Sequence, residues 1–334
     1  MMKAFFIERY GNKDRVRTGD LPIPELRDTD LLIQIHAAGV NPLDTKIRDG
    51  AFKAILPYRF PLILGNDVAG VVVKVGAKVQ RFKLGDAVYA RPAADRIGTF
   101  AEFIAINEAD VAIKPKELSM AEAASFPLVG LTAWQALIEQ AQLKKGQKVF
   151  IQAGSGGVGT IAIQLAKHVG AIVATTTSKA NFDFVKRLGA DIVIDYKTED
   201  FETILKDYDV VLNSQEGTII EKSLRVLKPG GTLISISGPP DPAFAQEIGA
   251  KWPVRMLLGV LSYRIRKKAQ QQQVRYSFLF MRASGEQLGE LSSLIDAEII
   301  QPVVDRSFAF EATKEALDYV ETGRAKGKVV VTMR

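Results

Sequence analysis

The pattern of hydrophobic and polar positions begins with short strands. Leu31–Ala37 alternates apolar and more polar residues, which is typical of a strand with one buried face. Further strands are predicted at Val68–Val73, Ala87–Ala90 and Glu102–Ile106, with turn-forming glycines between them. Because these strands follow one another before any alternation with helices begins, the first 120 residues predict a β-rich domain of their own.

The pattern changes in the middle of the chain, where apolar strands alternate with helical segments. Ile192–Ile194, Val210–Leu212 and Thr232–Ile236 are short β-branched or aliphatic runs, and Ile219–Leu227 has the spacing of a helix. This alternation predicts a parallel sheet with right-handed crossovers. Tyr276–Phe280 is predicted to be its last strand.

A glycine-rich stretch opens this region. The apolar run Val149–Ile151 precedes three glycines, Gly154, Gly156 and Gly159, and Thr160–Lys167 continues with helical spacing. The spacing is that of the G-x-G-x-x-G turn, in which the glycines allow a tight turn, approach of a pyrophosphate and close helix packing. With a strand before it and a helix after it, the stretch indicates dinucleotide binding; the alternative is an ordinary glycine-rich connection.

Composition limits the chemistry. The chain has 334 residues, which suits two domains, and it contains no cysteine. Disulfides, thiolate nucleophiles and cysteine-ligated metals are therefore excluded, and a reducing cytoplasmic location is expected. The net charge of +6 is modest for this length, so no nucleic-acid partner is expected. No apolar run is long enough to span a bilayer.

The segment before the last predicted strand breaks the alternation. Trp252–Leu261 is strongly apolar, and no acidic residue occurs between Glu247 and Glu286. The basic residues that follow the apolar run are Arg264, Arg266, Lys267 and Lys268. A lid or substrate-pocket helix is the favoured interpretation. A dimer contact and a helix lying on a membrane surface are the alternatives.

Several motifs together point to a known family. In chain order they are Gly39–Asp44, Leu64–Gly70, Gly85–Tyr89, Gly130–Ala133, Ala153–Gly159 and Gly323–Val330. With these motifs the chain resembles, over nearly its whole length, the medium-chain dehydrogenase/reductase superfamily. Within it the chain is similar to the zinc-free NADPH:quinone oxidoreductases and alkenal/enone reductases.

The resemblance implies an α/β fold of two domains. Both chain ends form a GroES-like β-rich domain, into which a Rossmann domain with a doubly wound parallel sheet is inserted. We expect the first part of the GroES-like catalytic domain at residues 1–122, the Rossmann NADPH-binding domain at 123–295, and the return to the catalytic domain at 296–334.

Two positions separate the chain from the zinc-dependent branch. Those relatives carry cysteine where this chain has Asn41 and histidine where it has Asn66, and their cysteine-rich structural-zinc loop is missing here. Asparagine amides do not form the Cys/His site that activates an alcohol oxygen. The sequence therefore predicts chemistry without a metal.

The expected cofactor is NADPH. NAD-preferring folds place a carboxylate about twenty residues beyond the first glycine of the motif. Here that region, Ala174–Lys179, has no carboxylate, and the first one after the motif is Asp183. The hydroxyl residues and the lysine of this region instead suit the 2′-phosphate of NADPH. The alternative interpretation is that the region is only an exposed polar turn. The cofactor-binding candidates from the motif and the turn are Gly154, Ser155, Gly156, Gly157, Val158, Gly159, Thr177, Ser178 and Lys179. The resemblance adds Lys46, Thr132, Tyr196 and Lys328.

Hydride transfer needs little acid–base machinery, because the cofactor carries the chemistry and the protein aligns it with the acceptor. Asn41 and Thr132 are the catalytic candidates beside the nicotinamide, with Asp44 in support. The predicted substrate-pocket residues are Phe52, Tyr58 and Phe278, for which core packing is the alternative.

These inferences predict an NADPH-dependent oxidoreductase that transfers hydride to a quinone or an α,β-unsaturated carbonyl. A homodimer is expected. The alternatives are an enoyl-thioester reductase of the same superfamily and a noncatalytic NADPH-binding sensor or scaffold.

Overall fold

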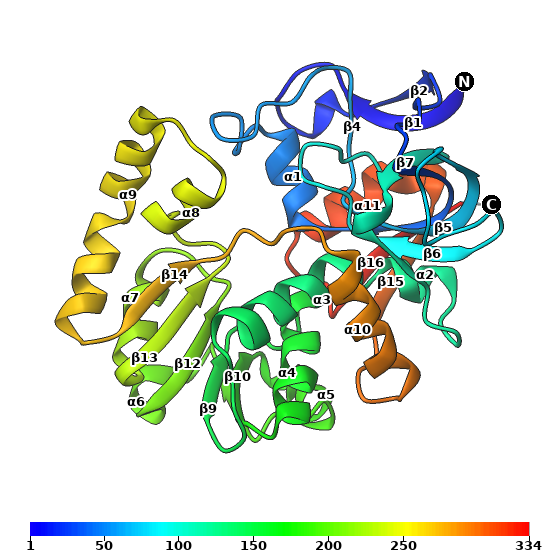
Figure 1. Cartoon of the computed structure of the whole chain (residues 1–334). Helices are drawn as coiled ribbons and strands as arrows, with labels where there is room; N and C mark the ends of the chain where they lie inside the picture. Colours follow the sequence, from blue (N-terminus) through cyan, green and yellow to red (C-terminus); the bar gives the residue numbers. More distant parts are fainter. Residues whose placement is uncertain (334) are drawn as a thin grey trace. The chain divides into compact units, whose positions relative to one another are not determined.

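The computed structural model describes residues 1–333 and divides the chain into two compact units (Figure 1). Unit 1 contains residues 1–131 and the stretch from Arg282 onward, and unit 2 contains Thr132–Met281. Unit 2 is shorter at both ends than the expected 123–295. At the first junction, α2 (Met120–Ala124) packs on strands of unit 1, and the boundary falls within α3 (Pro127–Trp134).

The second junction also differs from the expected boundary, again because a helix packs on unit 1. Helix α10 (Gly285–Asp296) packs against a unit 1 strand, β8 (Val111–Ile113). The Tyr89 hydroxyl also donates to the backbone oxygen of Leu288, at 2.7 Å. The helix that the sequence assigned to the end of the Rossmann domain therefore belongs to the β-rich unit.

Unit 1 contains two sheets. The larger has the strand order β15-β16-β3-β5-β6-β8, with β7 also paired to β3, and the smaller has the order β2-β1-β4. Their bounds are β1 Met2–Ile7, β2 Arg17–Leu21, β3 Asp30–Val40, β4 Leu62–Ile63, β5 Asp67–Val75, β6 Ala87–Ala90, β7 Phe103–Asn107, β15 Val304–Ala309 and β16 Lys328–Thr332. Helices α1 (Pro42–Arg48) and α11 (Thr313–Glu321) complete the unit.

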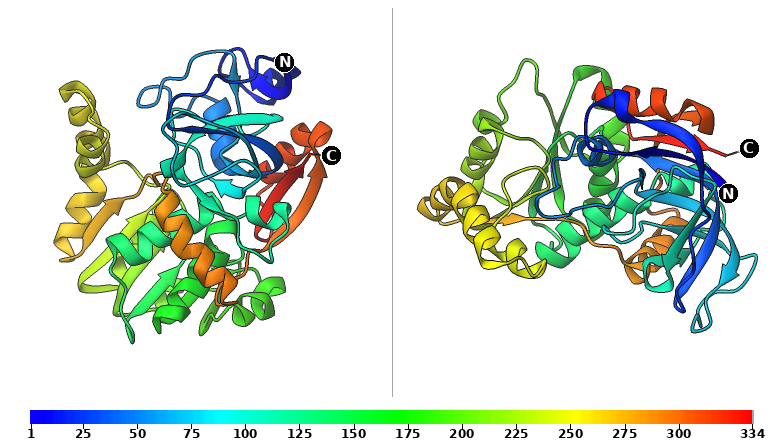
Figure 2. Two further views of the ribbon diagram at one scale, coloured as in Figure 1. Left: turned by 45° about the vertical axis from the view of Figure 1, so that its right-hand side comes forward. Right: turned by 90° about the horizontal axis from the view of Figure 1, so that it is seen from above.

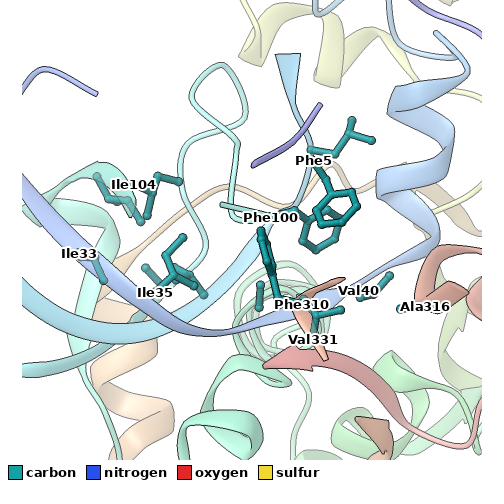
Figure 3. Close-up of a cluster of buried hydrophobic side chains, with 14 of the residues drawn as sticks. Phe5, Ile33, Ile35, Val40, Phe100, Ile104, Phe310, Ala316 and Val331 are labelled. Carbon is teal, nitrogen blue, oxygen red and sulfur yellow. The ribbon is translucent and has the colours of Figure 1, made fainter. Parts of the chain in front are cut away.

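The two ends of the chain share one sheet and one core. Strand β16 pairs antiparallel with β3, with Val330 opposite Gly39. Figure 3 shows side chains from both ends in the same cluster, where Phe5 and Phe310 meet edge to face with ring centroids 5.1 Å apart. The prediction of a β-rich domain formed by both chain ends is thereby confirmed.

Unit 2 is a six-stranded parallel sheet with the order β11-β10-β9-β12-β13-β14. Its strands are β9 Lys148–Ile151, β10 Ile172–Thr177, β11 Ile192–Asp195, β12 Tyr208–Asn213, β13 Leu227–Ser235 and β14 Arg275–Phe278. Its helices are α4 Gly157–Val169, α5 Phe182–Arg187, α6 Phe201–Ile204, α7 Thr218–Arg225, α8 Pro242–Glu247 and α9 Trp252–Gln271. The strand order reverses between β9 and β12, as in a doubly wound Rossmann sheet, which confirms the predicted fold class.

Candidate functional site

The turn between β9 and α4 is open at the start of the helix. The β9 residues Val149, Phe150 and Ile151 are fully buried and fix the strand in the sheet. Gly156 then occupies the position before the helix in an extended conformation, and no side chain caps the helix there. Because the first N–H groups of a helix lack acceptors within it, this end of α4 offers donors to an anion.

The three motif glycines differ in the space around them. A Cβ atom on Gly154 would lie 2.1 Å from Thr175 Oγ1, and one on Gly159 would lie 2.4 Å from the Ala153 backbone oxygen. Packing inside the unit therefore requires glycine at both positions. A Cβ on Gly156 would meet only the Ala153 oxygen, at 3.3 Å. Since packing leaves space at Gly156, the turn has the open surface that a pyrophosphate needs.

Hydroxyl groups gather beside this turn at the end of β10. Thr177 Oγ1 donates to Ser155 Oγ at 2.9 Å, and the Asn181 amide donates to the hydroxyl oxygens of Ser155 (3.2 Å) and Ser178 (3.3 Å). Lys179 is exposed next to them. Asn181 was not among the predicted residues, although its position three residues after Ser178 in the same polar turn was a usable signal.

Further polar atoms at the carboxyl ends of the central strands lack partners. Gln152 follows β9, Asn213 is the last residue of β12, and Ser214 follows it. Gln152 Oε1, Asn213 Nδ2 and Ser214 Oγ are buried without a hydrogen-bond partner among the described residues. Unpaired buried polar groups are rare and costly, and these lie where the strand order reverses, the place at which such sheets bind ligands. The residues present therefore fit a dinucleotide.

The remaining unit 2 candidates lie on other elements. Tyr196 is 61% exposed just after β11, and Thr132 is buried in α3. Phe278 is buried at the end of β14, where its ring packs edge to face on Phe244 at 5.1 Å. The packing alternative thus accounts for the position of Phe278 without a substrate.

In unit 1, a buried polar cluster forms where β3 ends and α1 begins. It consists of Asn41, Asp44, Asn66, Asp67 and Lys328, whose exposed fractions do not exceed 5%. Asn41 follows β3, Asp67 begins β5 and Lys328 begins β16, and both of these strands pair with β3. The neighbouring strands therefore bring together residues that are far apart in the sequence.

Lys328 and Asp67 form the charged centre of this cluster. Lys328 Nζ donates to Asp67 Oδ2 at 2.9 Å and to Asn41 Oδ1 at 2.5 Å. Asn41 Nδ2 donates to the same Asp67 oxygen at 2.8 Å, while the Leu128 N–H donates to the other oxygen at 2.6 Å. The Asn41 amide is thus held on both sides, and the Lys328 ammonium is a buried, paired cation.

Asp44 is the second carboxyl group of the cluster. It accepts from the Asn66 amide at 2.6 Å and from the Asn41 backbone N–H at 2.7 Å. Burial raises the pKa of Asp44 to about 7, because these donors and the Lys328 charge only partly offset the cost of desolvating a carboxylate, and the Asp67 charge adds to that cost. Asp44 was predicted in a supporting role, but its buried environment depends on Asn66, Asp67 and Lys328, whose contacts are not visible in the sequence.

The cluster does not fit a zinc ion. Neither amide is a Cys/His-type ligand, and the Lys328 ammonium contacts both Asn41 and Asp67, so a metal cation would meet a positive charge. Within residues 1–333, no group of three or more His, Asp and Glu side chains is arranged to hold a metal. The cluster already contains its cation.

The other unit 1 candidates lie outside the cluster. Lys46 is exposed on α1, and Phe52 and Tyr58 pack half-buried against the core. The Tyr58 hydroxyl donates to the Ala94 backbone oxygen at 2.7 Å. The structure therefore brings Asn41, Asp44 and Lys328 together, but not Lys46.

Comparison with known proteins supplies the family. Residues 27–116 match the alcohol dehydrogenase GroES-like domain, and residues 188–331 match a family described as zinc-binding dehydrogenase. The chain is 37% identical over 343 residues to 2-methylene-furan-3-one reductase of Solanum lycopersicum, covering 99% of this chain and 79% of that protein. The chain belongs to the medium-chain dehydrogenase/reductase superfamily.

Two further comparisons place it within that superfamily. The chain is 34% identical to the chloroplastic NADPH-dependent alkenal/one oxidoreductase of Arabidopsis thaliana, covering 99% of this chain and 79% of that protein. The solved quinone oxidoreductase from Coxiella burnetii superposes with a TM-score of 0.87 at 33% identity, covering 100% of this chain and 99% of that chain. The predicted resemblance to quinone and enone reductases of the medium-chain superfamily is confirmed.

Proposed function

We propose that this medium-chain reductase uses NADPH to deliver hydride to a quinone or an α,β-unsaturated carbonyl, without a metal. The observation that carries the proposal is the open turn at Gly156, together with the unpaired buried polar groups at the carboxyl ends of β9 and β12. That arrangement fits a dinucleotide, and the relatives that share the fold are named as enone, alkenal and quinone reductases.

The preference for NADPH rests on the turn after β10. Ser155, Thr177 and Ser178 present hydroxyls, the exposed Lys179 adds a positive charge, and no carboxylate lies in the turn. A 2′-phosphate is an anion that accepts hydrogen bonds, so both features favour it over the 2′-hydroxyl of NADH. The relative from Arabidopsis thaliana is itself named as NADPH-dependent.

Bound NADPH supplies the hydride from its nicotinamide ring, so the chain's own residues need only bind and orient. The α4 N-terminus and the motif glycines would hold the pyrophosphate. Asn41 and Thr132 remain our candidates for positioning the nicotinamide, with Asp44 and Lys328 fixing Asn41 from two sides. Lys46, Tyr196 and the pocket aromatics stay predictions, as do a homodimer and a cytoplasmic location.

The proposal is tested by NADPH oxidation with a small quinone, a short alkenal and crotonyl-CoA as acceptors. Turnover of the quinone or the alkenal supports it. Preferential turnover of crotonyl-CoA would favour the enoyl-thioester reductase. NADPH binding without turnover of any acceptor would favour a noncatalytic protein.

Cofactor preference is tested separately by binding. NADPH is expected to bind at least about tenfold tighter than NADH, which is about 1.4 kcal/mol. Lys179→Ala should remove most of that difference, because only NADPH carries the 2′-phosphate. Lys186→Ala, an exposed lysine on α5, is the matched control and should preserve it. Equal losses for both cofactors in Lys179→Ala would show that the lysine does not read the phosphate.

A further inference from the structure

Helix α9 has a buried face and an unpartnered apolar face. The helix is 20 residues long, and Leu258, Ser262, Ile265 and Ala269 form its buried side. Ile265 and Ala269 belong to the core of unit 2, and the helix lies beside α8 in the views of Figure 2. This inward face attaches the helix to the rest of unit 2.

The outward face is made of large apolar side chains. Trp252, Met256, Val260 and Tyr263 recur at helical spacing and are 71%, 61%, 71% and 58% exposed, and Leu257 and Leu261 flank them. From Trp252 to Tyr263 the stripe is about 17 Å long at 1.5 Å per residue. An exposed apolar patch of this kind marks an interaction site. It is also longer than a single quinone ring would cover.

Positive charges border the stripe. Lys251 and Arg255 lie at its start and Lys267 at its end, with the Lys267 ammonium 5.9 Å from the centre of the Tyr263 ring. Among the described residues, no carboxylate forms an ion pair with these three, whereas Arg264 and Lys268 pair with Glu221 on α7. Three uncompensated cations around an apolar stripe are complementary to an anionic partner with an apolar interior.

We propose that α9 docks this chain onto a membrane surface rich in anionic phospholipid, with the helix axis parallel to the surface. Trp252, Met256 and Val260 enter the boundary between headgroups and acyl chains, and Lys251, Arg255 and Lys267 meet lipid phosphates. This is peripheral binding: within residues 1–333, no helix is long and apolar enough to cross a bilayer. A second copy of the chain is a poorer occupant, because it would bring the same cations against each other.

The test is co-sedimentation with phosphatidylcholine vesicles, with and without phosphatidylglycerol. The chain should bind only the anionic vesicles, and binding should fall as salt rises. Met256→Ser/Val260→Ser and Lys251→Gln/Arg255→Gln/Lys267→Gln should each weaken binding at least about tenfold. Ile172→Ser/Ile192→Ser, at exposed apolar positions on β10 and β11, is the matched control and should bind normally. Vesicles should also shift tryptophan emission to the blue, and Trp252→Phe should abolish that shift.

Three results would overturn the proposal. The first is no binding of the unmodified chain to anionic vesicles. The second is undiminished binding of Met256→Ser/Val260→Ser, which would reduce the effect to the net positive charge. The third is normal vesicle binding of the cation variant. Two further outcomes apply if the chain does not bind vesicles. If it self-associates and Met256→Ser/Val260→Ser abolishes the self-association, the face contacts a second copy. If that variant instead changes the KM for the acceptor, the face is part of a lid. Circular dichroism and NADPH affinity confirm that each variant is folded.

Discussion

The polar cluster of unit 1 and the sheet edge of unit 2 differ in how their hydrogen bonds are completed. In the cluster, Asn41, Asp67 and Lys328 bond to one another, and a buried lysine balances a buried carboxylate. At the sheet edge, Gln152, Asn213 and Ser214 have buried atoms without partners among the described residues. The cluster pairs its charged groups within the chain and leaves one buried atom, Asn66 Oδ1, without a partner among the described residues, whereas the sheet edge leaves three that a ligand would complete.

The two regions suit different tasks: the unit 1 cluster positions a side chain, and the unit 2 sheet edge binds a ligand. Asn41, Asp67 and Lys328 each bond to the other two, and such mutual bonding restricts all three side chains, so the cluster suits a role in holding Asn41 in one orientation. Unpaired buried groups cost stability until something pairs with them, so the sheet edge suits a role in taking up a cofactor. Substitutions in the cluster should therefore change stability, and substitutions at the edge should change binding.

The largest expected effect is on stability, from Lys328→Met. Removing the ammonium leaves Asp67 buried without its cation, and breaking a buried pair costs about 3–5 kcal/mol. Urea denaturation measures this loss. Adding Asp67→Asn should restore more than half of it. Lys78→Met is the control, because its ion pair with Asp28 is exposed and contributes at most about 1 kcal/mol. If Lys328→Met and Lys78→Met lowered the free energy of unfolding equally, the Lys328–Asp67 pair would be no more protected from water than the exposed pair.

A smaller effect is expected on binding, from Gly156→Val. A Cβ at this position meets only the Ala153 backbone oxygen, at 3.3 Å, which a small local shift relieves, so the protein should stay folded with a Tm lowered much less than in Gly159→Val, while NADPH affinity falls at least about 100-fold, or about 2.8 kcal/mol. Calorimetric titration measures the affinity. Gly159→Val is the counterpart, since its Cβ would clash with the Ala153 oxygen and should lower Tm itself. Unchanged NADPH affinity in Gly156→Val would place the pyrophosphate elsewhere.

The smallest effect is on the pH dependence of stability, through Asp44. Its folded pKa of about 7 lies above the ordinary value of 3.8, so the folded state holds a proton that the unfolded state releases. The contribution of Asp44 to the free energy of unfolding is therefore largest at low pH and falls as pH rises from about 4 to 7. Between pH 6 and 7 the fall is about 1 kcal/mol. Asp44→Asn should remove that fall in urea denaturation at the two pH values. An unchanged fall in the variant would mean that another group causes it.

The sequence predicted the repeating parts of the fold better than its boundaries. Hydrophobic periodicity located β3, β5 and the parallel strands, because those residues alternate or run together as burial requires. The local spacing of residues 308–320 favours a single helix, but the structure divides this segment between a strand and a helix. Phe308 lies in β15, where pairing opposite Val331 holds it extended, and α11 begins only at Thr313. Pairing with a distant strand is not visible in local spacing.

The candidate sites show the same limit. The glycine turn was predictable because its spacing is local, and its packing agrees with the roles given to Gly154 and Gly159. The partners of Lys328 were not, since they lie 261 and 287 positions away in the chain. Asn213 and Ser214 were missed because a polar residue after an apolar strand is common. Only the strand order shows that these two follow a central strand.

The Lys328 ammonium also has an evolutionary consequence. Replacing Asn41 with cysteine, the residue that zinc-dependent relatives carry there, would remove an acceptor from the buried lysine and a donor from Asp67. Replacing Lys328 first would leave Asp67 uncompensated. Both of these first steps toward a Cys/His metal site thus destabilise the protein. The buried lysine therefore acts as a barrier to exchanging this cluster for a metal site, because either of these replacements must be compensated by a second one.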